Sequence, residues 1–418
     1  MVMEQKFTRR EVLGMTAGLL KAATLGPAGA ALAQPNAAGR LIRPDRVGTI
    51  LYTQRDVPSR AGIWNNPSPT MGYLGGPNFP DDPNDLGPLV PLPGGFLELF
   101  EFLAECGFKQ VEFAGYNQHA ANRGGANPGP GNPTAYLEYA KTLRKFLDDT
   151  GLEAIGNHGF IPNTWPGGPG GGMSQADYDR FHLELEFASI LGMPYMGTGG
   201  DPTSSRHKED WDVAAEKWEA LNELARPYRI KIYPHNHADA YNFLLDGPMV
   251  EVTEDLNTGQ PLPQPQIVRS SSGKRMMQYY LDITNRNLCV CEIDIYWAYV
   301  AQHRFQWYYN ENGERVQDIL DPIAQIRNNS TRYHLYHAKD GERTTQPPGV
   351  GNGYNMIPFG DPRSAIPYKQ LFMEQRAHGL KNPNYEQDNA PGGAADPGQS
   401  LRFAKISARN MMALNRRT

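Results

Sequence analysis

Residues 96–114 read FLELFEFLAECGFKQVEFA and combine a helical pattern with a β-rich run. Apolar side chains recur on one face of residues 96–106, as in an amphipathic helix, and Gly107 stands where a helix C-cap is expected. A short β-rich run, residues 110–114, follows at once. The stretch therefore predicts a helix that leads directly into a strand, which is typical of a protein built around a parallel sheet.

The same alternation continues along the chain, and eight strand–helix alternations predict a (β/α)₈ TIM barrel in the α/β class. The expected strands are residues 49–52, 110–114, 152–157, 193–198, 229–233, 288–293, 333–336 and 384–386. Expected helices cover residues 96–106, 133–150 and 401–414, with two more after Ser174 and around Trp211 and Trp218.

The barrel domain is expected to span residues 47–418, with insertions near residues 57–92 and 246–272. The second insertion is rich in Pro, Gly and Gln and shows no periodicity, so we expect a loop or a small excursion there. Long loops that follow strands build the active-site face of a barrel, and their placement here predicts a deep, walled pocket.

The N-terminal segment has the features of an export signal. It reads Thr8-Arg9-Arg10-Glu11-Val12-Leu13, continues with a mildly apolar stretch and ends in Ala31-Leu32-Ala33. Adjacent arginines before an apolar region and a small-residue cleavage site indicate a twin-arginine signal over residues 1–33, followed by a linker, residues 34–46. An ordinary secretory signal or an amphipathic helix is the alternative. We expect a periplasmic or extracellular protein.

Charge limits the classes of partner. Residues 1–33 carry four basic and two acidic side chains, so their removal changes the net charge from −5 to −7. An acidic chain is a poor candidate for binding nucleic acid, whose phosphates require a basic face. It also lacks a basic patch for a membrane surface. We expect a small carbohydrate or polyol as substrate, and the sequence leaves open whether identical subunits assemble.

The three cysteines, Cys106, Cys289 and Cys291, do not form a disulfide framework. Cys289 and Cys291 are two residues apart and share one face of a strand, so we expect buried core. Free thiols are consistent with folding in a reducing compartment before export.

Side chains that bind metals fall at the ends of several expected strands. They are Glu112, His158, His235, His237, Glu292, Asp294, His337, Glu386 and Asp388. Because the carboxyl ends of parallel strands meet on one face of a barrel, we expect these side chains to lie close together. Mixed nitrogen and oxygen ligands suit manganese, zinc, iron or cobalt better than calcium. Within each pair on one strand, one member suffices as a ligand, and the other is free to orient it or to hold substrate.

Together these segments resemble the sugar phosphate isomerase/epimerase family, the xylose-isomerase-like barrels, over about residues 47–414. The similar segments are Leu51-Tyr52-Thr53-Gln54-Arg55, Gly107-Phe108 with Val111-Glu112-Phe113-Ala114-Gly115-Tyr116, His235-Asn236-His237, Glu292-Ile293-Asp294-Ile295-Tyr296-Trp297, His337-Ala338-Lys339-Asp340 and Tyr385-Glu386-Gln387-Asp388.

The resemblance implies a divalent metal, often manganese, with zinc, iron or cobalt as alternatives. Its implied ligands are His235, Asp294, His337 and Glu386. It also implies proton abstraction next to a sugar carbonyl, with the metal as Lewis acid. Candidates for moving the proton are Glu386, His158 and His237, and Lys339 would add positive charge near the developing oxyanion. Candidates for binding substrate are Glu112, Tyr116, Trp297 and Asp340; the two aromatic rings fit a packed core equally well.

Two positions differ from the ketose epimerases of this family. His235 stands where those enzymes have Glu, and Trp297 stands where they have His. Both differences argue against simple ketose 3-epimerase activity. The leading hypothesis is a metal-dependent sugar isomerase or epimerase, and the sequence does not specify the reaction. A metal-dependent lyase or hydrolase that acts on keto-glycosides by β-elimination is one alternative, and a non-catalytic exported sugar-binding protein is another.

Overall fold

The computed structural model describes residues 39–60, 69–116, 121–122, 125–126, 129–375 and 382–415. The expected signal segment, residues 1–33, lies outside the described residues and stays a prediction, as does most of the linker.

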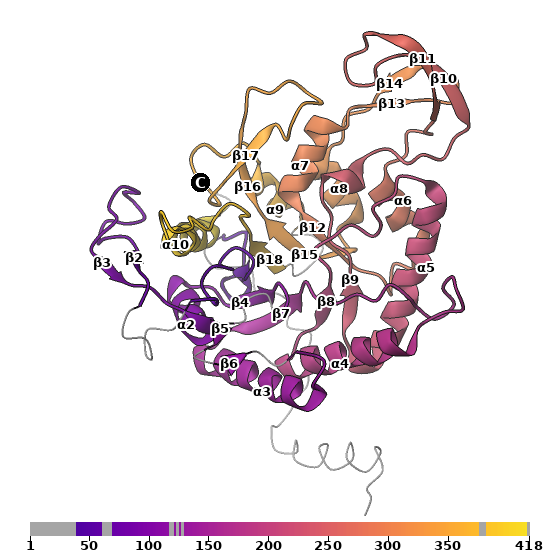
Figure 1. Ribbon diagram of the computed structural model, residues 1–418. Coiled ribbons are helices and arrows are strands. Elements are labelled where there is room, and N and C mark those ends of the chain that lie inside the picture. Colours follow the sequence, from indigo (N-terminus) through magenta and orange to yellow (C-terminus); the bar gives the residue numbers. More distant parts are fainter. Residues whose placement is uncertain are drawn as a thin grey trace, which may run out of the picture. The chain divides into compact units, whose positions relative to one another are not determined.

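Eight strands run parallel and line the interior of the fold (Figure 1). They are β1 (Gly48–Ile50), β4 (Gln110–Phe113), β7 (Glu153–Asn157), β8 (Tyr195–Gly197), β9 (Lys231–Tyr233), β12 (Cys291–Asp294), β15 (Tyr333–Ala338) and β18 (Asn382–Tyr385). Each expected strand is present, shifted by one to three residues at its ends.

The strands close into a ring. Six of them form a sheet in the order β12-β15-β18-β1-β4-β7, and β8 pairs with β9. A parallel bridge between His158 and Gly197 joins β7 to β8. On the other side of the β8-β9 pair, the backbone N–H of Glu292 donates to the carbonyl of Pro234 at 3.1 Å and joins β9 to β12. The predicted (β/α)₈ barrel is therefore confirmed.

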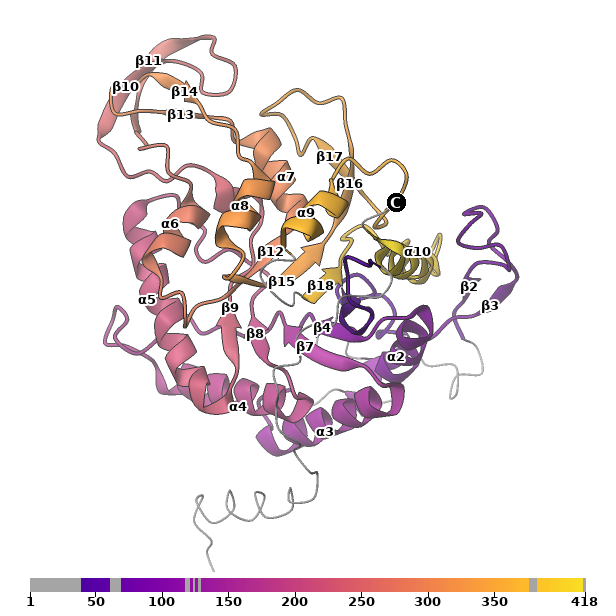
Figure 2. The same ribbon diagram turned by 180° about the vertical axis from the view of Figure 1, so that it is seen from behind.

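Helices pack around the outside of this ring (Figure 2). They are α2 (Gly95–Cys106), α3 (Pro133–Thr150), α4 (Gln175–Leu191), α5 (Lys208–Ala225), α6 (Met276–Ile283), α7 (Ile295–Arg304), α8 (Pro322–Asn329), α9 (Tyr368–Gln375) and α10 (Gln399–Ala413). Short 3₁₀ turns occupy Pro44–Arg46, Arg226–Tyr228 and Ala238–Tyr241. No helix of the described residues is long and apolar enough to cross a membrane.

Helix ends follow from the sequence. Gly107 ends α2 with a φ of 99°, a left-handed conformation that favours glycine. Ser174 caps α4 by accepting the N–H of Asp177. In a capping box the side chain of Asp177 would in turn accept the backbone N–H of Ser174. Here it accepts the hydroxyl of Thr164 at 2.6 Å instead.

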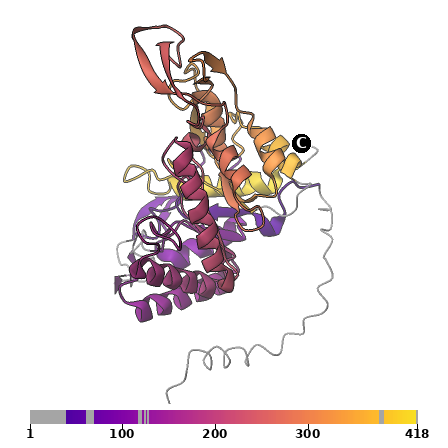
Figure 3. The ribbon, with the colours of Figure 1, turned by 90° about the vertical axis from the view of Figure 1, so that its right-hand side faces the viewer.

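The second insertion is more ordered than the sequence predicted. Residues 246–272 contain a hairpin of β10 (Met249–Glu254) and β11 (Pro261–Arg269), which projects from the barrel (Figure 3). Most of its side chains are exposed on both faces, so no apolar period marks its strands. β11 contains three prolines, which have no N–H to donate. Proline is tolerated in an edge strand, but a segment with several prolines is not predicted as a strand from its sequence.

Further hairpins extend the loops around the barrel. In the first insertion, β2 (Met71–Tyr73) pairs with β3 (Leu89–Pro91). Three more hairpins were not anticipated: β5 (Ala121–Asn122) with β6 (Gly125–Ala126), β13 (Trp307–Tyr309) with β14 (Arg315–Gln317), and β16 (Asp340–Arg343) with β17 (Tyr354–Ile357).

One large hydrophobic core lies between the strands and the helices. Trp211 and Trp218 of α5 are fully buried in it. Cys289 and Cys291 are buried there as expected, and all three thiols are free. The inside of the barrel is different, because its upper layers are filled by charged and polar side chains, and these form the candidate site.

Candidate metal and active site

Strand register brings the predicted metal ligands together. Asp294 of β12 lies opposite His337 of β15, and His337 lies opposite Asn384 of β18, two residues before Glu386. Side chains alternate between the two faces of a strand, so two residues that are two positions apart on one strand can both point into the barrel. The carboxyl ends of strands six, seven and eight therefore deliver an aspartate, a histidine and a glutamate to one place.

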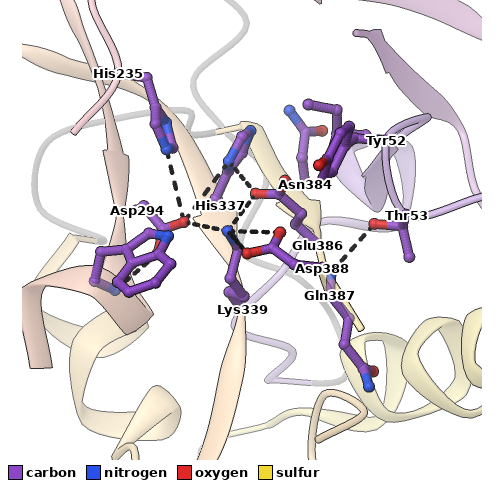
Figure 4. A network of polar contacts seen from close by, with 12 residues as sticks. Tyr52, Thr53, His235, Asp294, His337, Lys339, Asn384, Glu386, Gln387 and Asp388 are labelled. Carbon is purple, nitrogen blue, oxygen red and sulfur yellow. Dashed lines mark hydrogen bonds and ion pairs between the residues drawn. The ribbon is translucent and has the colours of Figure 1, made fainter. Parts of the chain in front are cut away.

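Lys339 lies among three carboxylates at the mouth of this site (Figure 4). Its ammonium Nζ is 2.9 Å from Asp294 Oδ2, 2.9 Å from Glu386 Oε2 and 3.1 Å from Asp388 Oδ1. The Lys339 side chain is only 2% exposed. Burial alone would lower the pKa of this lysine, but Asp294, Glu386 and Asp388 outweigh it and raise the pKa well above its usual value. A permanent positive charge is therefore fixed in the site.

Three buried atoms fit a metal ion. Asp294 Oδ2, His337 Nδ1 and Glu386 Oε2 lie within 4.8 Å of one another. Each is buried and makes no hydrogen bond of good direction, although each lies within ion-pair distance of a neighbour. His235 Nε2 approaches the same point, at 3.7 Å from Asp294 Oδ2. Carboxylate oxygens and imidazole nitrogens that converge in this way, beside the ammonium of Lys339, fit a metal cation with mixed nitrogen and oxygen ligands.

A second cluster lies one layer deeper, around Glu292. Its carboxylate contacts His158 Nε2 at 2.7 Å, His235 Nδ1 at 3.2 Å and His337 Nε2 at 3.0 Å. Burial alone would raise the pKa of Glu292, but His337, His158 and His235 outweigh it and hold the pKa well below its usual value. Glu292 is thus a buried anion in contact with three imidazoles.

Glu112 lies beside this cluster and differs from Glu292 in its partners. It accepts hydrogen bonds from the hydroxyl of Tyr233 and from Asn384 Nδ2, the latter at 2.8 Å, and contacts His337 Nε2 at 3.0 Å. Burial and the nearby Glu292 raise its pKa. Glu112 was predicted to bind substrate, but it is fully buried beneath the predicted ligands.

Two other predicted substrate contacts point away from the site. Tyr116 is buried against Phe187, with ring centroids 3.9 Å apart. Asp340 accepts bonds from the N–H groups of Gly341 and Gly360 and from the hydroxyl of Ser364, which holds the segment after β17 against the start of β16. Since Lys339 points inward, the next residue along the strand points outward. The function proposed below assigns neither residue a substrate contact.

The other predicted site residues lie at the mouth. His237 is half-buried, and its ring packs against His235 and Trp297 with centroid distances of 5.1 Å and 5.6 Å. Burial, together with Lys339, lowers the pKa of His237 to about 4. Lys339 Nζ lies 5.5 Å from the centre of the Trp297 ring, and the indole Nε1 is buried without a hydrogen bond. His158 reaches the same region through its contact with Glu292.

Two residues support the site that sequence reasoning did not assign. Asn236 uses its amide to bond both the N–H and the carbonyl of Asp294, at 3.1 and 3.2 Å. Asp201 accepts the backbone N–H of His237 at 2.6 Å. Side chains alternate along an extended chain, so Asn236 points away from the histidines on either side of it. This alternation is the sequence signal that could have identified Asn236 as a supporting residue. Nothing local in the sequence indicates Asp201.

Comparisons with known proteins agree with the barrel fold. Residues 100–386 match the model of the xylose isomerase-like TIM barrel family. A sugar phosphate isomerase/epimerase from Parabacteroides distasonis superposes with a TM-score of 0.51 at 15% identity, over 92% of this chain and 98% of that one. No protein in a search of curated proteins matches.

Two more distant structures are a probable 3-DHS dehydratase from Bacillus anthracis and a protein named IOLI with a bound zinc atom. The first has a TM-score of 0.48 and 11% identity, over 89% of this chain and all of that one. The second has a TM-score of 0.46 and 12% identity, over 77% of this chain and 95% of that one.

The fold and the ring of polar strand ends define a (β/α)₈ barrel of the kind that carries an active site at the carboxyl ends of its strands. The chain belongs to the xylose isomerase-like TIM barrel family, whose model matches more than half of its length.

Proposed function

We propose that the protein is a divalent-metal-dependent enzyme that removes a proton from the carbon next to a sugar carbonyl, as in isomerisation or epimerisation. The observation that carries the proposal is the convergence of three buried ligand atoms, Asp294 Oδ2, His337 Nδ1 and Glu386 Oε2. His235 completes the ligand set. Manganese, zinc, iron and cobalt all suit two imidazoles and two carboxylates.

A bound divalent ion would supply Lewis-acid stabilisation of the negative charge that develops on the carbonyl oxygen. The chain supplies the rest. Lys339 holds a fixed positive charge at the mouth, ion-paired with Asp294, Glu386 and Asp388, and stabilises negative charge on substrate.

His237 is the first candidate for moving the proton. Its ring is half-buried, while those of His235 and His337 are buried. It packs beside Trp297, so a sugar that lies on the indole face brings its hydrogens near an imidazole nitrogen. His158 is the second candidate, and Glu386 is the third, although its contact with His337 favours a role as ligand.

The same proton abstraction is the first step of β-elimination, so a lyase that acts on keto-glycosides is the second candidate function. Trp297 favours it, because an indole at the mouth offers a stacking surface for a second sugar ring. Export by the twin-arginine route, directed by residues 1–33, belongs to the proposal and places the enzyme in the periplasm or outside the cell.

The test has two parts. The protein without residues 1–33, purified without chelator, is analysed for metals beside the His337→Ala variant. We expect near-stoichiometric metal that the variant loses. The wild type is then incubated in D₂O with keto-sugars and keto-glycosides, and hydrogen exchange next to the carbonyl is followed by NMR. A protein that takes up no metal would exclude the proposal and leave a sugar-binding protein as the better description. If no tested sugar exchanges hydrogen, proton abstraction on this substrate class is excluded.

A further inference from the structure

Glu292 occupies an unusual place for a charged side chain. It lies within β12, is fully buried, and points into the barrel two residues before Asp294. Barrel interiors of this class are mostly filled by branched apolar residues. A buried carboxylate costs several kcal/mol in desolvation unless its partners are well placed. Three imidazoles from three other strands provide those partners.

The direction of these contacts fixes which ring nitrogens carry hydrogen. An ionised carboxylate only accepts hydrogen bonds, so each nitrogen that faces Glu292 must donate. His235 faces it with Nδ1 at 3.2 Å and makes a hydrogen bond to Oε2. His337 Nε2 also lies 3.0 Å from Glu292, but its hydrogen bond is with Glu112 Oε2. The opposite nitrogen of His235, Nε2, is directed to the upper site and lies 3.7 Å from Asp294 Oδ2, beyond hydrogen-bond distance.

We infer that Glu292 is a positioning residue that sets the tautomer and ring orientation of His235, so that His235 binds the metal through Nε2. This inference rests on the proposed metal site and deepens it. A histidine whose other nitrogen donates to a carboxylate is a better oriented and more basic ligand. The same oxygen of Glu292, Oε2, also contacts His158 Nε2 at 2.7 Å, which links strand six to strands three and five.

The arrangement meets a requirement of the histidine at strand five. An imidazole is a useful ligand at this position only with Nε2 free of hydrogen, and Nδ1 must then donate elsewhere. Glu292 Oε2 is the acceptor that the structure provides. Glu112 does not duplicate this function for His235. Its oxygens contact Tyr233, Asn384 and His337, and no contact with His235 occurs among the described interactions.

The decisive variant is Glu292→Gln, which keeps the size of the side chain but replaces one acceptor oxygen with a donor. We expect the affinity for Mn²⁺ or Zn²⁺, measured by competition with a chelating dye on EDTA-stripped protein, to fall roughly 10- to 100-fold. Glu292→Asp retains an acceptor-only carboxylate and is expected to recover part of the affinity. Glu184→Gln is the matched control, because Glu184 is also a buried glutamate and accepts from Tyr136 far from the site.

A second measurement needs no metal. Long-range ¹H–¹⁵N spectra of histidine-labelled, EDTA-stripped wild type are expected to show His235 protonated at Nδ1, and Glu292→Gln is expected to shift this tautomer while Glu184→Gln does not. Protonation of wild-type His235 at Nε2, or wild-type metal affinity in Glu292→Gln, would overturn the positioning function.

The two measurements separate this inference from the proposed function. A wild type that binds no divalent ion yet shows the expected tautomer and its shift would refute the metal site and retain the effect of Glu292 on His235. Metal binding together with the opposite tautomer would retain the metal site and refute the function of Glu292.

Discussion

Asp294 accepts a hydrogen bond from the backbone N–H of Trp297 at 2.9 Å through Oδ1. Its other oxygen, Oδ2, is buried and faces the site. One carboxylate therefore caps helix α7 and offers a ligand atom, which ties the position of the metal site to the start of that helix. The two duties can be separated by substitution, because asparagine caps a helix as well as aspartate does.

Asp294→Asn is expected to keep α7 and lose the metal. The amide oxygen can still accept from Trp297, but Nδ2 replaces the anionic Oδ2. We expect a loss of divalent-ion affinity beyond the roughly 10- to 100-fold typical of residues that only orient a ligand. Asp321→Asn is the matched control, because Asp321 caps α8 through the N–H groups of Ile323 and Ala324 outside the site. Equal metal content in both variants would remove Asp294 from the ligand set.

Lys339→Met tests the balance of charge at the mouth. The substitution leaves Asp294, Glu386 and Asp388 without their shared ammonium, and loss of one partner of a buried ion pair costs about 3–5 kcal/mol. We expect a lower free energy of unfolding in urea for the EDTA-stripped variant. Added Mn²⁺ or Zn²⁺ should stabilise the variant more than the wild type, because the cation neutralises the same carboxylates.

The control for this prediction is Lys208→Met. Lys208 forms an ion pair with Asp212 on the exposed surface of α5, and such pairs contribute little. A Lys339→Met protein as stable as the wild type in EDTA would show that the three carboxylates are not held together by the lysine.

The fold and the upper site could be predicted from the sequence because both depend on short-range rules. Alternation of side chains places His337 and Lys339 on one face of a strand, and the parallel order of strands brings Asp294 and Glu386 beside them. The same rule applied one residue further explains why Asp340 lies elsewhere: it points outward and holds a loop.

The deeper layer could not be predicted in the same way. The contacts of Glu292 join residues 134, 57 and 45 positions away, and only the register of the closed barrel decides which of them meet. The β10–β11 hairpin was missed for a different reason, because its strands are exposed on both faces and carry no apolar period.

Asp201 is expected to make stability depend on pH. Burial, opposed by the N–H of His237 and reinforced by Asp239, raises the pKa of Asp201 to about 6 from a usual value of 3.8. Between these values the folded protein binds more protons than the unfolded chain, so the contribution of this group to stability falls as pH rises from about 4 to about 6. Asparagine does not titrate in this range, so the Asp201→Asn variant lacks this loss of stability. Its amide oxygen can still accept the backbone N–H of His237.

Urea unfolding of wild type and Asp201→Asn at several pH values measures the effect. The variant should gain stability relative to the wild type as pH rises, by no more than about 3 kcal/mol for a shift of about two units. Asp149→Asn on the exposed side of α3 controls for the removal of a carboxylate. Parallel curves for wild type and Asp201→Asn would contradict the raised pKa.

Asn222 of α5 is expected to stabilise the strand that leads to His235. Its side chain is buried and accepts the N–H of Ile232 at 2.8 Å while donating to the Ile232 carbonyl at 2.9 Å. Asn222→Ala leaves both backbone groups buried without partners, which costs about 1–3 kcal/mol for each group. We expect a lower free energy of unfolding in urea and faster hydrogen exchange at Ile232.

Asn257→Ala is the control for this change, because Asn257 is exposed in the β10–β11 hairpin and its loss should alter stability by less than about 0.5 kcal/mol. Divalent-ion affinity shows whether the effect of Asn222→Ala is confined to Ile232 or extends to the metal site. Since Ile232 is three residues before His235, loosening of β9 should weaken metal binding in Asn222→Ala and leave Asn257→Ala unchanged. Unaltered exchange at Ile232 would show that the barrel holds this strand without the asparagine.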